Sequence, residues 1–394
     1  MWAVLVVMLC LTLGAALSAG QDSGAATAHD HFYNLEYDQA LAEFTTQALQ
    51  HPEAMGAWNH IAQCILYRAM YRDGALESGL VSGGNSIFRR SKVKIGLEDD
   101  KRFTEAVART EQLAQARLKL DPKDKDALYA FGVAYGIRAN FAFLVKKAWL
   151  EALRDATIAR KAHNKITEMD ANFVDARLIQ GVHDYVIGSL PLTYRFLGFL
   201  AGFRGDRPAG IHALETVARS GTRSNIDAEV LLIAIYRREK RSKDAIPLLA
   251  ELIRRFPRNH LFRFEMVEMY EDIGSKDQAM AEIAEIERLK ATGAPGFKDV
   301  RDEKIDYIAG NVLFRCDDLD GALAHMKKVM AKARDLDSNT ELMAWMRLGQ
   351  IHDLRGERAQ AVAAYKEVIA SAPQSEIAKE SRGYISSPYR RKAS

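Results

Sequence analysis

The chain has 394 residues, of which 48% are hydrophobic, so it is long enough to bury a large core in one or more domains. Its 55 basic and 52 acidic residues leave a formal charge of only +3, which excludes a strong uniform field that would recruit nucleic acid or anionic membrane. Only nine prolines interrupt a sequence rich in Ala, Leu, Glu, Lys and Arg, and this composition predicts an all-α protein.

The first segment is apolar from Met1 to Leu17 and ends in the small residues 18–20. This pattern predicts a secretory signal peptide over residues 1–20, cleaved near Gly20, although the usual positive charge at its start is missing. An uncleaved N-terminal membrane anchor is the alternative. We therefore expect an exported protein, either periplasmic or extracellular.

Two cysteines, Cys64 and Cys316, remain after this leader. We expect both to be buried helix residues. A disulfide between them stays open as an alternative, but it would have to join distant parts of the chain.

The residues 21–225 contain a degenerate helical repeat. Its marks are aromatic and small residues at recurring spacing: Tyr37, Ala40, Phe44, Pro52, Trp58, Tyr129, Gly132, Tyr135, Leu178, Gly181 and Tyr185. Three insertions, at about 69–103, 138–151 and 188–204, separate the two helices of successive units. We expect the apolar insertions to be helical and to pack over the repeats.

The residues 226–373 carry the repeat in regular form. Its clearest unit contains Trp345, Leu348 and Gly349 in a first helix and Ala361 and Tyr365 in a second. Small residues at Gly349 and Ala361 allow the two helices to approach closely. Residues 374–394 are predicted to form a capping helix followed by a frayed basic tail.

This pattern resembles the tetratricopeptide repeat, which has a period of about 34 residues and forms helical hairpins. The predicted fold is therefore an all-α solenoid of about eight hairpins. Its units begin near residues 21, 55, 125, 174, 226, 260, 303 and 342. The first helices of such a solenoid line a concave groove, which is the usual place for a ligand.

One segment is more specific than the repeat. It comprises Ser189, Leu190, Pro191, Gly202, Phe203, Gly205, Asp206 and Arg207. The segment resembles a signature of the tetratricopeptide repeat protein 39 and inclusion-body clearance family, and of related bacterial secreted repeat proteins. The resemblance implies the same helical architecture, with Gly205 and Asp206 turning the chain and capping a helix. Members of that family are linked to lipid handling and to clearance of aggregated protein.

Motifs for catalysis and for cofactors are missing from the sequence. No Walker loop, dinucleotide fingerprint, nucleophile elbow or zinc-protease helix occurs. His29 and His31 lack partners at metal-ligand spacing, and His183 is expected to be a packed helix residue. We therefore predict no enzyme activity, no cofactor and no metal, and no nucleic-acid partner.

The predicted ligand surface is the groove lined by the first helices. Its residues are Asn59, Gln63, Tyr129, Tyr185, Arg237, Phe264, Glu268, Tyr307, Asn311, Phe314, Met343 and Met346. Aromatic and methionine side chains favour a protein or peptide segment with apolar anchors. The sequence thus predicts a non-catalytic exported scaffold. An envelope-associated lipid or acyl-chain handling module, with membrane-surface contact through the apolar insertions, is the alternative, and coverage of the groove by those insertions also remains open.

Overall fold

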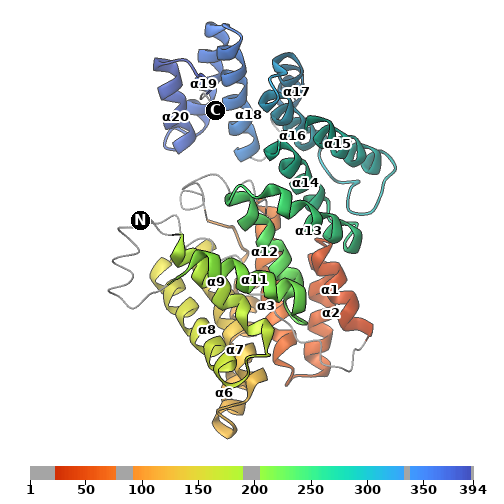
Figure 1. Ribbon diagram of the computed structural model, residues 1–394, viewed down its shortest axis with the longest axis vertical. Coiled ribbons are helices and arrows are strands. Elements are labelled where there is room, and N and C mark those ends of the chain that lie inside the picture. The colour runs from red at the N-terminus through yellow and green to blue at the C-terminus, as the bar shows by residue number, and fades with distance from the viewer. Residues whose placement is uncertain (1–22, 77–91, 190–204, 332–337, 392–394) are drawn as a thin grey trace. The chain divides into compact units, whose positions relative to one another are not determined.

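A computed structural model describes residues 23–76, 92–189, 205–331 and 338–391 (Figure 1). Every regular element in these ranges is a helix. The chain divides into two compact units, residues 1–248 and 249–394, which we describe one at a time. The leader at 1–20, residues 77–91 of the first predicted insertion and residues 190–204 of the third lie outside the described residues.

The first unit contains ten helices in its described part. They are α1 (Ser23–Tyr33), α2 (Tyr37–Gln50), α3 (Met55–Arg72), α6 (Leu97–Leu120), α7 (Lys125–Leu144), α8 (Trp149–Met169), the short 3-10 helix η1 (Val174–Ala176), α9 (Arg177–Gly188), α11 (Arg207–Ser220) and α12 (Asn225–Arg238). Helix α13 (Ser242–Arg255) crosses into the second unit.

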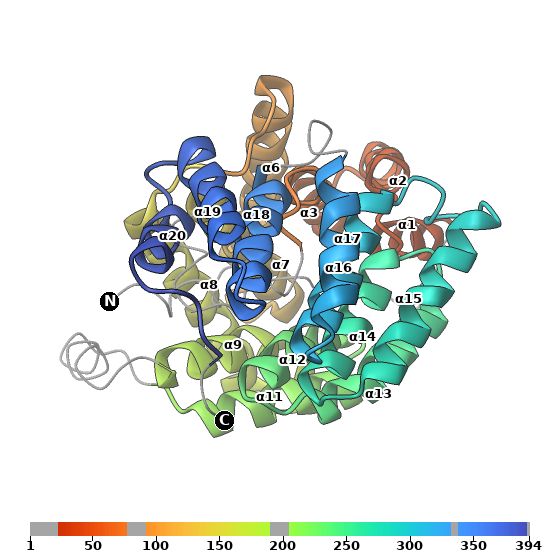
Figure 2. The same cartoon turned by 90° about the horizontal axis from the view of Figure 1, so that it is seen from above.

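The second unit continues with the described helices α14 (His260–Asp272), α15 (Lys276–Ala291), α16 (Asp302–Arg315), α17 (Leu319–Ala331), α18 (Ser338–Leu354), α19 (Arg358–Ser371) and α20 (Glu376–Ser386). Helices α18 and α19 lie side by side, and α20 packs against α19 (Figure 2).

Consecutive helices pair as hairpins, each with a first (A) helix and a second (B) helix. Contacts join α1 with α2, α3 with α6, α7 with α8, α9 with α11, α14 with α15, α16 with α17, and α18 with α19. In the second unit the A helices α14, α16 and α18 also contact one another in turn, and α18 contacts α20. The result is a tetratricopeptide-type stack of helical hairpins, as the repeat pattern predicts.

Glycines in the A helices permit the close approach within hairpins. A Cβ placed on Gly349 would lie 2.3 Å from Cε1 of Tyr365, and one on Gly132 would lie 2.2 Å from Cδ2 of His163. Since real Cβ atoms do not come so close, only glycine fits at these two positions. The predicted role of small residues in the repeat is therefore confirmed.

Five of the turns between A and B helices share one geometry. Leu35, Lys240, Gly274, Asp317 and Gly356 each have a positive φ, between 58° and 75°. The backbone N–H that follows each of them donates to a carbonyl five residues earlier, as in Arg241 N to Tyr236 O and Glu357 N to His352 O. This is the left-handed helix ending that usually selects glycine.

The predicted insertion at 138–151 does not form a separate element, because its residues belong to α7, to the short turn that follows and to the start of α8. Helix α7 runs without interruption to Leu144, and α8 begins at Trp149. Because residues 138–144 contain neither proline nor glycine, the helix continues through them. Helix α7 is the one described helix long and apolar enough to span a membrane, and 83% of its apolar window is buried inside the protein.

Both cysteines are free thiols. Cys64 is buried in α3, as expected, and burial raises the pKa of its thiol. Cys316 lies just beyond α16 and is only half-buried, so the expectation of a buried helix residue is wrong for Cys316.

Candidate functional site

The twelve residues predicted to line the groove all lie on A helices. Seven of them are buried: Asn59, Gln63, Tyr129, Tyr185, Phe264, Phe314 and Met346. The five that keep partial exposure are Arg237, Glu268, Tyr307, Asn311 and Met343. Four of these five belong to the second unit, so the accessible part of the predicted surface concentrates there.

The predicted residues of the first unit are occupied by contacts inside it. Asn59 Nδ2 donates to the backbone oxygen of Ala130 at 2.9 Å, and the Tyr185 hydroxyl donates to Glu239 Oε1 at 2.8 Å. The Tyr129 ring stacks on His163 at 5.0 Å. The groups that cover these side chains include residues of neighbouring repeats.

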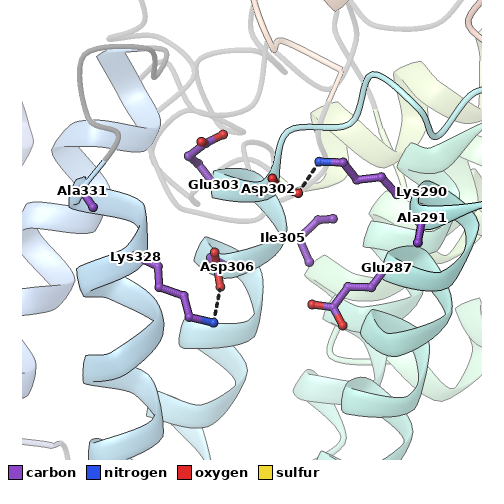
Figure 3. A pocket seen from close by; sticks show the side chains of 9 residues that line it. All are labelled: Glu287, Lys290, Ala291, Asp302, Glu303, Ile305, Asp306, Lys328 and Ala331. Atoms are coloured by element: carbon purple, nitrogen blue, oxygen red, sulfur yellow. Dashed lines mark hydrogen bonds and ion pairs between the residues drawn. The ribbon is translucent and has the colours of Figure 1, made fainter. Parts of the chain in front are cut away.

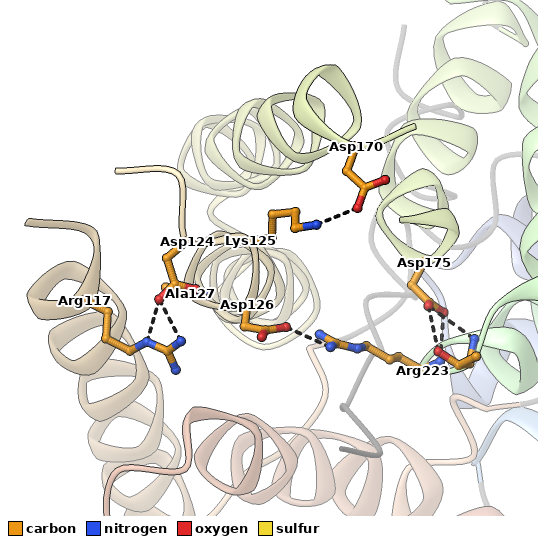
Figure 4. A network of polar contacts seen from close by, with 9 residues as sticks. Arg117, Asp124, Lys125, Asp126, Ala127, Asp170, Asp175 and Arg223 are labelled. Atoms are coloured by element: carbon orange, nitrogen blue, oxygen red, sulfur yellow. Dashed lines mark hydrogen bonds and ion pairs between the residues drawn. The ribbon is translucent and has the colours of Figure 1, made fainter. Parts of the chain in front are cut away.

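Polar contacts also tie together the turns that join successive hairpins of the first unit (Figure 4). Lys125 bonds to Asp170 at 2.5 Å, and Arg223 Nη2 lies 2.8 Å from Asp126 Oδ1. The Asp175 carboxylate accepts from the backbone N–H of Arg223 and of Ser224, both at 2.9 Å. These contacts fix the spacing of the repeats and leave no free acid or base for chemistry in this network.

The family-like segment has a structural role wherever it is described. Ser189 is the C-cap of α9, and Asp206 caps α11 by accepting from Ala209 N at 2.8 Å. A Cβ on Gly205 would lie 2.5 Å from Cβ of Ile187, so the chain enters α11 pressed against α9. Arg207 pairs with Glu239 at 3.2 Å. The predicted turn and cap are confirmed, while Leu190, Pro191, Gly202 and Phe203 lie outside the described residues.

The histidines considered for chemistry are packed side chains. His29 lies 4.6 Å from His60, ring to ring, and His31 pairs with Glu36. His183 is buried, and its burial lowers the pKa of the imidazole. In the ranges that the structure describes, no cluster of three or more His, Cys, Asp or Glu residues has the arrangement of a metal site.

The A helices of the second unit bring predicted groove residues around an arginine that the sequence did not single out. Arg347 on α18 donates from Nε to Asn311 Oδ1 on α16 at 2.8 Å. Its guanidinium also lies 4.1 Å from the centre of the Phe314 ring. Burial lowers the pKa of Arg347. Arg347 stands four residues after Met343, so its place on the same helix face was available from the helical period.

The basic tail packs on this unit, so the expectation that it frays is wrong for residues 387–391. The backbone N–H of Tyr389 donates to Asp353 Oδ2 at 2.8 Å. Arg391 Nη2 donates to the Phe314 carbonyl at 2.6 Å and pairs with Asp317 at 2.9 Å. The tail thus runs from α20 past the end of α18 to the end of α16.

A hollow of about 590 Å³ lies among α15, α16 and α17 (Figure 3). Its charged lining consists of Glu287, Asp302, Glu303, Asp306, Lys290 and Lys328. Lys290 pairs with Asp302, Lys328 with Asp306, and Arg301 with Glu303, so three of the four carboxylates have a cationic partner.

No protein-family model and no curated protein sequence matches the chain. Several solved repeat structures are similar to it at low identity. Yeast Tom70 is 12% identical over 92% of this chain and 87% of that chain, with a TM-score of 0.40. A human IFIT1 dimer with m7Gppp-AAAA is 11% identical over 93% and 81%, with a TM-score of 0.44. The TPR domain of P58(IPK) is 13% identical over 92% and 86%, with a TM-score of 0.23.

Proposed function

We propose that this chain is a non-catalytic, exported scaffold that binds a protein or peptide segment on the A-helix face of its second unit. The observation that carries the proposal is the tail itself. A non-helical stretch of polypeptide, residues 387–391, already lies against α16 and α18 through backbone and side-chain contacts. A surface that holds one such segment has the donors, acceptors and aromatic groups to hold another.

The accessible side chains near this surface support a peptide ligand. Tyr307, Asn311 and Met343 are partly exposed, and Arg347 presents a cation among them. Aromatic, Met and Arg residues are the types enriched where proteins bind one another. The net charge of +3 gives no reason to prefer a nucleic acid.

Panning a peptide display library against residues 21–394 tests the proposal. We expect some peptides to be enriched. We expect Met343→Glu to weaken the binding of these peptides by at least about ten-fold, because the substitution places a charge in the apolar part of the face. Ala363→Glu, on an exposed position of α19, is the matched control and should bind as the unaltered protein does. No enrichment, or equal loss in both variants, would contradict the proposal.

Export is a separate part of the proposal and needs its own measurement. Mass spectrometry of the protein purified from its native host should give a first residue at Gln21 or close to it. An intact N-terminus recovered with membranes would favour the anchored alternative.

The lipid-handling alternative has one structural observation in its favour. Trp149 and Leu150, at the start of α8, are 38% and 63% exposed, and Lys146 and Lys147 precede them. Such a combination can contact a membrane surface. Flotation with anionic liposomes that is lost in a Trp149→Ser/Leu150→Ser variant would support this function, and no flotation would exclude it.

A further inference from the structure

We infer that the C-terminal segment 387–391 is an internal ligand, and that the surface beneath it recognises a partner segment of the same chemistry: a tyrosine followed two residues later by an arginine. This inference rests on the proposed function and specifies its site and its partner. The tail would then hold the site closed until such a segment displaces it.

The first element of the site is Asp353, at the end of α18. Its side chain is fully buried and accepts from Arg358 Nη1 at 2.7 Å and from the Tyr365 hydroxyl at 2.9 Å. The third donor is the backbone N–H of Tyr389. Since two of the donors belong to α19, the carboxylate stays partnered when the tail leaves, and it is positioned to accept the N–H of an incoming chain.

The second element is the end of α16, where arginine is bound. Arg391 donates to the carbonyls of Phe314, at 2.6 Å, and of Arg315, at 3.3 Å. Carbonyls in the last turn of a helix lack some of their helical partners and attract a cation. A planar guanidinium can reach both oxygens at once, whereas a lysine ammonium cannot do so in the same fixed geometry.

The third element is aromatic. The Arg391 guanidinium lies 5.1 Å from the centre of the Phe314 ring, and the Tyr389 ring lies 6.2 Å from the same ring. The Tyr389 ring also meets Tyr384 edge to face at 5.3 Å. A ligand therefore gains from both a tyrosine and an arginine at this spacing.

Charge and backbone geometry favour the same class of ligand. Asp317, whose side chain is 75% exposed, pairs with Arg391 and draws a basic segment to the end of α16. Ser387 has an extended backbone, with φ −139° and ψ 116°, as expected for a residue before proline. The neighbouring Arg390 is exposed, and the proposed recognition uses only the contacts of Tyr389 and Arg391.

Because the tail is tethered, it competes at an effective concentration in the millimolar range. An external segment with similar contacts therefore binds weakly to the intact chain. Substitutions that weaken the binding of the tail, but leave the surface beneath it intact, should therefore let an external peptide bind more tightly.

The test uses a fluorescent synthetic peptide of residues 386–394 and the full chain after its leader. Fluorescence anisotropy should show at least about ten-fold tighter binding to a Tyr389→Ala/Arg391→Ala variant than to the unaltered protein. A variant with Arg390→Ala is the matched control and should bind as weakly as the unaltered protein. A peptide carrying alanine at the position of Arg391 should lose most of its binding to the double variant.

A second variant separates an effect on the contacts of the tail from a loss of stability in the double variant. Arg391→Lys keeps the charge of the tail but loses the paired contact with the two carbonyls. It should bind the peptide at a strength between the unaltered protein and the double variant, at an unchanged melting temperature.

Equal binding to the unaltered protein and to both weakened variants would overturn the inference and leave the tail as a structural strap. Concentration-dependent dimerisation of the unaltered protein through the tail would overturn closure in cis and assign the site to a second copy. If library peptides bind equally well to the unaltered protein and to the tail variants, the scaffold function stands and only this inference fails.

Discussion

The Tyr33 hydroxyl on α1 donates a 2.8 Å hydrogen bond to Asp227 Oδ1 on α12, so two residues 194 positions apart meet inside the first unit. Asp227 is buried, and Oδ2 of its carboxylate has no hydrogen-bond partner among the described residues. Burial raises the pKa of Asp227 well above its usual range, and the nearby Asp175 adds to this effect, although the bond from Tyr33 opposes it. The burial of this carboxyl between α1 and α12 therefore favours its protonated form.

This relationship predicts a dependence of stability on pH. Between the unfolded pKa, about 3.9, and the raised folded pKa, the folded state keeps a proton that the unfolded state has lost, so stability falls as pH rises through that window. In Asp227→Asn this contribution is absent. Urea denaturation at pH 5 and pH 8 should show the variant gaining stability relative to the unaltered protein over that interval.

Glu105→Gln is the control for Asp227→Asn, since Glu105 is an exposed carboxylate on α6 of the same unit. Its difference from the unaltered protein should not change with pH by more than a few tenths of a kcal/mol. A pH-independent difference for Asp227→Asn as well would show that Asp227 is ionised in the folded state.

Replacing glycine by alanine should have opposite effects on stability at two positions of the second unit. Gly349→Ala should destabilise the second unit by about 1–3 kcal/mol, because its Cβ would lie 2.3 Å from the Tyr365 ring. Gly383→Ala, in α20, meets nothing within 4 Å and should be neutral or stabilising by up to about 1 kcal/mol, because alanine favours helix. Equal effects in thermal unfolding would contradict the close packing of α18 on α19.

The repeat was predictable from the sequence because it depends on local periodicity. The glycines, the A and B helices and the cap at Asp206 all follow from spacing along one hairpin. The long-range contacts were not predictable in this way. Nothing near Tyr389 in the chain indicates that its N–H meets Asp353, 36 residues earlier, and nothing near Tyr33 indicates Asp227.

The residues predicted to line the groove also show that a local sequence pattern does not predict long-range contacts. Tyr129 and Tyr185 stand at positions that often face a ligand, yet they are buried against His163 and Glu239. The helical period places a residue on a face, but only the neighbouring repeats determine how much of that face is covered. Whether the accessible residues bind a partner stays a prediction.

The A-to-B turns predict a stabilising substitution. Lys240 is exposed and has a φ of 58°, a conformation in which a side chain costs roughly 1 kcal/mol and glycine almost nothing. Lys240→Gly should therefore raise the free energy of unfolding by about 1 kcal/mol. In the reciprocal variant, Gly356→Ala, φ is 75° and a Cβ meets nothing within 4 Å, so the strain should act alone and lower stability by a similar amount. A loss of stability in Lys240→Gly would show that the turn does not hold this conformation.

The family-like segment predicts that its residues act through folding. Asp206→Ala removes the bond to Ala209 N and should cost about 1 kcal/mol, whereas Asp206→Asn keeps an acceptor and should cost much less. Gly205→Ala should cost more, because its Cβ would meet Ile187 Cβ at 2.5 Å and the backbone nitrogen of Gly188 at 2.7 Å. Chemical denaturation measures all three variants. If binding of a library peptide fell in Asp206→Ala at an unchanged stability, the segment would belong to a binding surface, and its resemblance to the family signature would then concern function as well as architecture.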